Sequence, residues 1–161
     1  MIVTLSTEEM VRAAAIGVKR RVSSLGRCQD RLLSTSRGAW DIDIEGACGE
    51  LAAALALGLE WRGDVDTYKK PDLDHNIQVR TTQGNPARLR MSPRDSPNER
   101  FVLVVGVHPR YEVVGWIDGN QFREKKYWHA ERKVWYIPYE LLNSLSELLK
   151  VINEEKTNVS V

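Results

Sequence analysis

The sequence predicts a mixed α/β fold in which one mixed β-sheet is flanked by helices. Three observations lead to this expectation. Two helical segments come first, several short strand-like segments follow, and a leucine-rich helical segment closes the chain. A single sheet with helices packed on it accommodates this order.

The composition fits one soluble globular domain. The chain has 161 residues, of which 42% are hydrophobic and 28% are charged, and this length can bury a core. We expect a single domain over residues 1–161, with a core from about 7 to 152 and a flexible tail at 153–161. The net charge of +1 means that nucleic acid could be attracted only by local basic clusters.

The sequence carries no evident signal for export or membrane insertion. Its longest apolar run, near residues 51–59, is too short to span a bilayer, and the first ten residues lack signal-peptide order. Cys28 and Cys48 are too few for a disulfide framework or a cysteine-based zinc site. We therefore expect a cytoplasmic protein with no membrane partner. The absence of a phosphate-cradling glycine loop argues against a nucleotide cofactor.

Two helices are expected in the first third of the chain. Ser6 and Glu9 have capping-box spacing, and Gly26 closes the first helix. A second helix is expected from about Ile44 to Gly58, after a polar connection. The apolar positions that predict a buried face on the first helix are Val11, Ala14, Ala15, Val18, Val22 and Leu25.

Strands are expected between the second helix and Pro138. The segment NIQVRTT alternates between apolar and polar residues, FVLVVGV is almost continuously apolar, as in a strand covered on both faces, and YEVVGWI is its hairpin partner. ARLRM and VWYIP are two further short strands. Pro138 is then expected to begin a helix. The apolar stripe of that helix is Leu141, Leu142, Leu145, Leu148, Leu149 and Ile152.

Glu50 is the single charged residue in GACGELAAALALGL, residues 46–59. A helix that is apolar on nearly every side is buried, and an isolated carboxylate there is costly unless something compensates its charge. A metal ion, a buried arginine or a raised pKa could each do so. In the alternative interpretation, Glu50 reaches the surface between small alanines.

Two aspartates precede the alternating strand in PDLDHNIQVR. Asp72 and Asp74 could be ordinary turn residues beside a proline. They could also be ligands, because Gln78 and Arg80 emerge together on one face of the strand that follows. Carboxylates, an amide oxygen and a cation within one hairpin are the groups that magnesium-assisted phosphoryl chemistry uses.

Together these segments resemble the PD-(D/E)XK nuclease superfamily, and within it the small phage- and prophage-type members. The resemblance rests on GACGELA, PDLDHNIQVRTT, FVLVVGV and YEVVGWI, in that order, and covers roughly residues 43 to 149. It implies the restriction-endonuclease-like fold and Mg²⁺-dependent cleavage of DNA, with Mn²⁺ as a second usable metal, in a prokaryotic or phage-infected cell. Many such nucleases act as dimers, so a homodimer is compatible with it.

The resemblance also implies roles for individual residues. Glu50 corresponds to the helix carboxylate, and Asp72 or its rival Asp74 to the metal-binding aspartate. Gln78 stands at the usual position of the second acidic residue, and Arg80 at that of the lysine. A metal-activated water would attack the phosphodiester. The expected metal ligands are Glu50, Asp72, Asp74, Gln78 and, through its carbonyl oxygen, Val79.

Two departures from the family pattern change the expected chemistry. Gln78 adds an oxygen but no negative charge, so magnesium should bind more weakly. Arg80 stays protonated and cannot act as a base, although it can oppose charge on a phosphate. If the site does not cut DNA, the protein is either a binding module of the same fold or an accessory protein in which Glu50 and Arg80 form a buried ion pair.

Two basic segments are candidates for contact with DNA. One flanks the proline-rich loop SPRDSPNER, and the other, FREKKYWHAERK, mixes cations with aromatic residues, which suits stacking on an unpaired base. In the alternative interpretation these are solvated loops, and Trp128 caps the edge of the core. The residues expected to bind nucleic acid are Arg88, Arg90, Arg94, Lys125 and Lys126.

Overall fold

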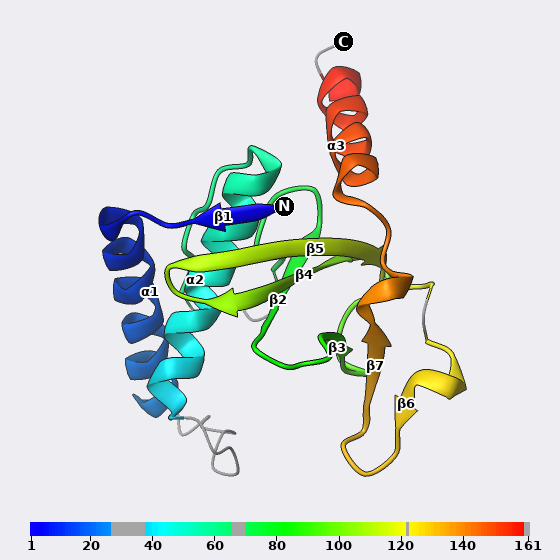
Figure 1. The fold of residues 1–161 in the computed structure, drawn as a ribbon, viewed down its shortest axis with the longest axis horizontal. Coiled ribbons are helices and arrows are strands. Elements are labelled where there is room, and N and C mark those ends of the chain that lie inside the picture. The colour runs from blue at the N-terminus through cyan, green and yellow to red at the C-terminus, as the bar shows by residue number, and fades with distance from the viewer. Residues whose placement is uncertain (27–37, 66–69, 122, 160–161) are drawn as a thin grey trace.

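The computed structural model describes residues 1–26, 38–65, 70–121 and 123–159 (Figure 1). The helices are α1 (Thr7–Gly26), α2 (Ala39–Leu57) and α3 (Leu145–Val159), with short 3₁₀ turns η1 (Lys125–Tyr127) and η2 (Tyr139–Leu141). The strands are β1 (Ile2–Thr4), β2 (Ile77–Thr82), β3 (Arg88–Met91), β4 (Arg100–Val107), β5 (Arg110–Asp118), β6 (Trp128–His129) and β7 (Val134–Pro138). None of the helices in these ranges is long and apolar enough to cross a lipid bilayer.

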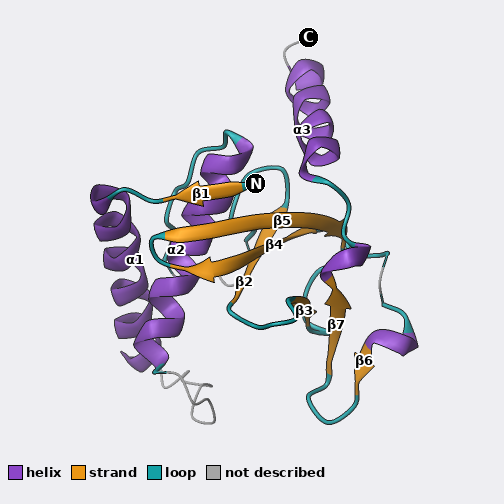
Figure 2. Cartoon of the chain, viewed as in Figure 1, coloured by secondary structure: helices purple, strands orange, loops and turns teal. Residues whose placement is uncertain are grey.

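The predicted mixed α/β fold is confirmed, but its strands form two sheets (Figure 2). Sheet A has the order β1-β5-β4-β2, with β2 parallel to β4 and the other pairs antiparallel. Sheet B has the order β3-β7-β6 and is antiparallel. The strand β2 therefore lies at one edge of sheet A.

Helices cover one face of sheet A, and sheet B covers the other. On the first face Val102 and Val104 of β4 belong to a buried cluster that also includes residues of α2 and α3. On the second face Phe101 and Leu103 pack in a cluster with Leu89 and Ile137 of sheet B. The prediction that FVLVVGV is covered on both faces is confirmed. A sheet with helices on both faces was expected, and here a small β-sheet takes the place of the second helical layer.

The first helix begins as its sequence predicts. The Ser6 N–H donates to the Glu9 carboxylate at 2.7 Å, and the Glu9 N–H donates to the Ser6 hydroxyl at 3.2 Å. These reciprocal bonds are the capping box, which satisfies backbone donors that the first turn leaves unpaired. The start of α1 is therefore determined locally.

The face that α1 buries is not the predicted one. The helix turns Ala13, Gly17 and Arg21 inward. Gly17 explains this choice, because a Cβ there would lie 2.6 Å from the Ile44 Cα of α2. Close approach of the two helix backbones at Gly17, and not burial of the bulky apolar side chains, thus determines which face of α1 packs on α2. Much of the predicted stripe is exposed instead, by 65%, 39%, 57% and 52% at Val11, Val18, Val22 and Leu25.

The other two helices have different bounds from those expected. Helix α2 begins at Ala39, ahead of the expected Ile44. Helix α3 begins at Leu145 and not at Pro138, because Asn143 exchanges two backbone hydrogen bonds with Trp116 of β5, at 2.8 and 3.0 Å. These bonds hold the chain in an extended bridge just before the helix. The expected tail at 153–161 is helical through Val159.

Candidate active site

A glycine sets the distance between α2 and the edge strand β2. A Cβ at Gly49 would lie only 1.9 Å from the Thr81 Oγ1 of β2, so a larger residue could not occupy this position unless Thr81 or the helix moved. The next residue is Glu50. Close approach at Gly49 therefore brings the lone carboxylate of the apolar helix beside β2.

Glu50 is buried, with 7% of its surface exposed, and it is fully paired. Arg20 of α1 donates to both of its carboxylate oxygens, at 2.6 and 2.8 Å, and the Trp61 indole donates at 3.2 Å. Burial alone would lower the pKa of Arg20, but the hydrogen bonds and charge of Glu50 raise that pKa above its ordinary value. An arginine was one of the three expected compensations for Glu50, and the partly buried Arg20 provides it.

Asp72 lies at the free edge of β2, close to Glu50. Its Oδ2 accepts the Val79 N–H at 2.8 Å. In a β-strand the N–H and C=O groups of one residue project to the same side, so the Val79 carbonyl faces this edge as well. Burial raises the pKa of Asp72 to about 7, and the charge of Glu50 adds to the shift; the Val79 hydrogen bond, Arg80 and Arg20 act against it. The two carboxylates are therefore near enough to repel each other.

Asp74 is separate from this pair. Its side chain is 53% exposed and accepts a hydrogen bond from the Arg62 guanidinium at 2.5 Å. The sequence left Asp72 and Asp74 as rivals for one role. In the structure only Asp72 is brought to Glu50.

Gln78 and Arg80 share one face of β2, as the alternation predicts, but it is the face opposite α2. Val79 is buried among the residues under the helices, so its neighbours in sequence must point toward sheet B. The Gln78 amide donates to the Lys70 carbonyl and the Glu99 carboxylate, both at 3.3 Å. Gln78 was expected to lie beside Glu50, and in the structure it lies on the opposite face of β2.

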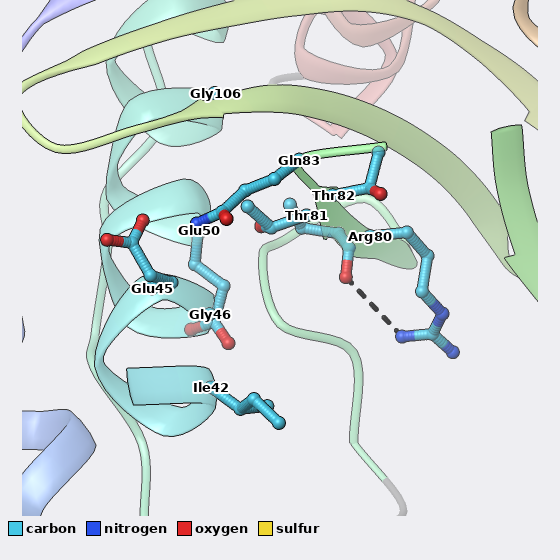
Figure 3. Close-up of a pocket in the computed structure, with 10 residues that line it drawn as sticks. Ile42, Glu45, Gly46, Glu50, Arg80, Thr81, Thr82, Gln83 and Gly106 are labelled. Carbon is cyan, nitrogen blue, oxygen red and sulfur yellow. Dashed lines mark hydrogen bonds between the residues drawn. The ribbon is translucent and has the colours of Figure 1, made fainter. Parts of the chain in front are cut away.

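Arg80 is also held away from Glu50. Its guanidinium pairs with Asp95 at 3.0 Å and lies over the Phe101 ring, 5.3 Å from the ring centroid. Figure 3 shows this side chain pointing away from α2 and its carboxylates. A weaker contact at 3.4 Å joins it to the Val79 carbonyl. The alternative of a Glu50–Arg80 ion pair is wrong, because Glu50 pairs with Arg20.

A small pocket of about 150 Å³ lies between α2 and β2, with Glu45, Glu50, Val79 and Thr81 in its wall (Figure 3). Within the ranges described, no three His, Cys, Asp or Glu side chains are grouped to hold a metal. The pocket wall includes the Glu50 carboxylate and Val79. The Asp72 carboxylate lies near both, because it accepts the Val79 N–H and responds to the charge of Glu50. This set fits Mg²⁺, which binds through one or two carboxylates and keeps several waters.

A second buried carboxylate lines the same pocket and was missed from the sequence. Glu45, 6% exposed, accepts the Tyr111 hydroxyl at 2.6 Å and shares a hydrogen bond with the His108 ring. Burial and the bond to Glu45 raise the pKa of Tyr111. Glu45 stands just before the apolar segment that drew attention to Glu50. The partner Arg20 was missed too, although its spacing from Ala13 and Gly17 places it on the buried face of α1.

The predicted nucleic-acid contacts lie in or beside sheet B, away from α2. Arg88 and Arg90 are exposed on β3, and Arg94 is exposed in the turn that follows. Lys125 and Lys126 are exposed in η1, where Lys126 pairs with Glu124 at 2.8 Å. The five predicted contacts are therefore all on or beside the small sheet.

Comparison with known proteins adds no relative. No family model matches the chain, and no curated protein and no solved structure matches it.

Proposed function

We propose that the protein is a Mg²⁺-dependent DNA phosphodiesterase whose metal-binding atoms are the carboxylates of Glu50 and Asp72 and the carbonyl of Val79. The observation that supports this most is the proximity of the two carboxylates, which burial and mutual repulsion push to a pKa of about 7 at Asp72. Ionising Asp72 beside Glu50 is unfavourable, and a cation bound between the two carboxylates would offset that repulsion. A bound Mg²⁺ would also activate a water molecule and neutralise phosphate charge.

The residues around this pair hold it in place. Arg20 binds both oxygens of Glu50, so the carboxylate cannot rotate freely. The Val79 N–H fixes one oxygen of Asp72, and Asp72 Oδ1 has no hydrogen bond to any part of the chain that the structure describes. A fixed carboxylate with a free oxygen, as at Asp72, is suited to metal binding, because a ligand held in advance loses little entropy when the ion arrives.

Arg80 is a second cation close to Asp72, because its charge acts to lower the pKa of that carboxyl. Its contact with the Val79 carbonyl at 3.4 Å places it at the same strand edge, although its main partner is Asp95. If a phosphate replaced Asp95, the guanidinium would donate to phosphate oxygens and oppose the charge of the transition state. Asp74 and Gln78, which the family resemblance implied as ligands, have no part in the proposed site.

Plasmid nicking tests this proposal. Purified protein should nick supercoiled DNA with Mg²⁺ or Mn²⁺ and not in EDTA, and Asp72→Asn should abolish nicking. Asparagine keeps an oxygen for the Val79 N–H but removes the charge that a metal requires. The matched control is Asp74→Asn, two residues away and exposed, which should cut like the wild type. Undiminished cutting by Asp72→Asn would contradict the assignment.

One observation favours a second candidate, a nucleic-acid-binding module without catalysis. Glu50 already has three hydrogen bonds, two from Arg20 and one from Trp61, so its charge is compensated without a metal. In that case the Glu50–Arg20 pair serves only to hold α1 on α2. The result expected for this candidate is salt-dependent retention of DNA with no nicking under any metal.

A further inference from the structure

The outer face of sheet B carries exposed cations on a strand whose other side chains are buried. Along β3, Arg88 and Arg90 are exposed, whereas Leu89 and Met91 are completely buried. The register of the sheet places Arg90 directly opposite Tyr136 of β7. Directly opposed residues in an antiparallel pair lie on the same face. The Tyr136 ring therefore shares this outer face with the two arginines.

The β6–β7 hairpin adds further groups to the same surface. The exposed His129 lies edge-on to the Tyr136 ring, with 5.8 Å between centroids. The Arg132 guanidinium donates to the Tyr136 hydroxyl at 3.2 Å. We call the set Arg88, Arg90, His129, Arg132 and Tyr136 the Tyr136 face.

The tryptophans of the hairpin are on the opposite side. Trp128 stands opposite Trp135 in the register, and their ring centroids are 4.6 Å apart. Trp135 packs against the cluster between the two sheets and is covered by the Arg123 guanidinium. The interpretation that Trp128 caps the edge of the core therefore fits the structure better than a stacking role. The half-buried Tyr136 and the exposed His129 are the rings on the same side of the sheet as the two arginines.

Positive charge is concentrated in the segments that form this surface. Residues 86–94 and 123–136 contain eight Lys and Arg side chains and two acidic ones, in a chain whose net charge is only +1. One of the two acids, Glu124, is paired with Lys126. A surface with this excess of positive charge and an outward-facing ring is complementary to a phosphate backbone with accessible bases.

We propose that the Tyr136 face binds single-stranded nucleic acid, with a base stacked on Tyr136 and phosphates contacted by Arg88, Arg90 and Arg132. A base in a duplex is already stacked between its neighbours, so the ring can accept only an unpaired one. The Tyr136 face should therefore bind single-stranded nucleic acid more tightly than a duplex.

The turn between β3 and β4 joins sheet B to the candidate active site. The Asp95 carboxylate pairs with Arg80 at the β2 edge, and the Asp95 carbonyl accepts a hydrogen bond from Arg123 at 2.5 Å. A nucleic-acid strand bound on sheet B is therefore separated from Arg80 only by the turn between β3 and β4. The view that this face selects the substrate for cleavage rests on the proposed nuclease function, whereas binding can be measured without cleavage.

Fluorescence anisotropy in EDTA measures that binding separately from catalysis. The probes are a labelled oligodeoxythymidylate of about 12 nucleotides and its duplex with oligodeoxyadenylate. Tyr136→Ala should weaken binding of the single strand about 5-fold or more, the effect of losing one stacked base. Tyr136→Phe keeps the ring and should bind like the wild type. Thermal unfolding of each variant confirms that the fold is retained.

Arginine variants test the electrostatic part. Arg90→Ala should weaken binding and reduce the slope of log K against log salt by about 0.7, the effect of one lost phosphate contact on a single strand. Arg110→Ala is the matched control, because Arg110 is exposed at the turn between β4 and β5 in sheet A. It should leave affinity and slope unchanged.

The outcomes separate this inference from the proposed function. Equal affinity for single strand and duplex, no binding of either, or equal affinities for Tyr136→Ala and Tyr136→Phe would overturn the single-strand assignment, whether or not the protein cuts DNA. Tyr136-dependent binding retained by Asp72→Asn supports the inference even if no nicking is found. The two proposals can therefore fail independently.

Discussion

At the scale of single residues, the most unusual group is Asp72. Its carboxyl is buried beside Glu50, and its pKa is raised to about 7 from an ordinary 3.8. Arg20 and Trp61 donate three hydrogen bonds to the neighbouring Glu50 carboxylate. Asp72 accepts one hydrogen bond, from Val79. Asp72 thus has fewer hydrogen-bond donors than Glu50, and its burial is the main cause of its raised pKa.

This difference predicts a specific pH dependence of stability. Because the folded-state pKa of Asp72 is higher than its unfolded value, ionisation of Asp72 costs stability as the pH rises from about 4 to about 7. Asp72→Asn should therefore unfold with nearly the same free energy as the wild type at pH 4. At pH 8 it should be more stable by roughly 1–3 kcal/mol. Urea unfolding in EDTA across this range measures the difference, and a less stable Asp72→Asn at pH 8 would contradict the environment described for Asp72.

At the scale of elements, glycines decide how closely α2 approaches its neighbours. Gly17 lets α1 approach the backbone of α2 at Ile44, and Gly49 lets α2 approach Thr81 of β2. Both are inside helices, where glycine is normally unfavourable. Their positions are explained by close packing, which in turn places Arg20 and Glu50 within hydrogen-bonding distance.

Two glycines of α2 give a matched test of this packing. Gly49→Ala would bring its Cβ to 1.9 Å from Thr81 Oγ1, so we expect a loss of about 2 kcal/mol or more in unfolding free energy. Gly46→Ala, one turn earlier, has no atom within 4 Å of its Cβ and should gain up to about 1 kcal/mol from helix propensity. Chemical denaturation of both variants measures the two changes in unfolding free energy. Equal stabilities would mean that contact at Gly49 does not determine the packing of α2 on β2.

At the scale of the whole molecule, α3 extends from the body of the protein beyond the end of β5 (Figure 1). Leu148 and Ile152 attach it to the core. Near its C-terminal end, Glu155 accepts hydrogen bonds from Arg100 at 2.6 and 3.2 Å and pairs with His75 at 2.7 Å. The hydrogen bonds of Arg100 lower the pKa of Glu155. This contact connects the end of the helix to the start of β4.

We expect that loss of the Glu155 carboxylate would loosen the end of α3. In Glu155→Gln, backbone amides near residues 152–159 should exchange hydrogen several-fold faster at neutral pH, while those of α2 stay unchanged. The control is Glu154→Gln, at the neighbouring exposed position. Because the folded-state pKa of Glu155 is depressed, the wild type should lose the same protection as the pH falls through that value. Equal exchange in the two variants would show that Glu155 does not hold the helix.

The elements themselves were largely predictable from local patterns. The capping box at Ser6 and Glu9, the alternation in β2 and the apolar run of β4 each encode an element within a few residues. The strand β1 was missed because its three residues are too few to show a pattern. The start of α3 was misplaced because a bridge to Trp116, distant in sequence, keeps Asn143 extended.

The sequence by itself determined the α/β class, the order of most elements and the presence of an isolated acid on an apolar helix, since each of these depends on residues that are neighbours along the chain. Only the tertiary structure decided that Arg20 neutralises Glu50 from 30 positions away, that Asp72 and not Asp74 lies beside it, and that Gln78 and Arg80 point toward a second sheet. The spacing of side chains predicts which residues share a face. Which element packs against that face depends on contacts between segments that are distant in the sequence, and here Gly17 and Gly49 allow those contacts.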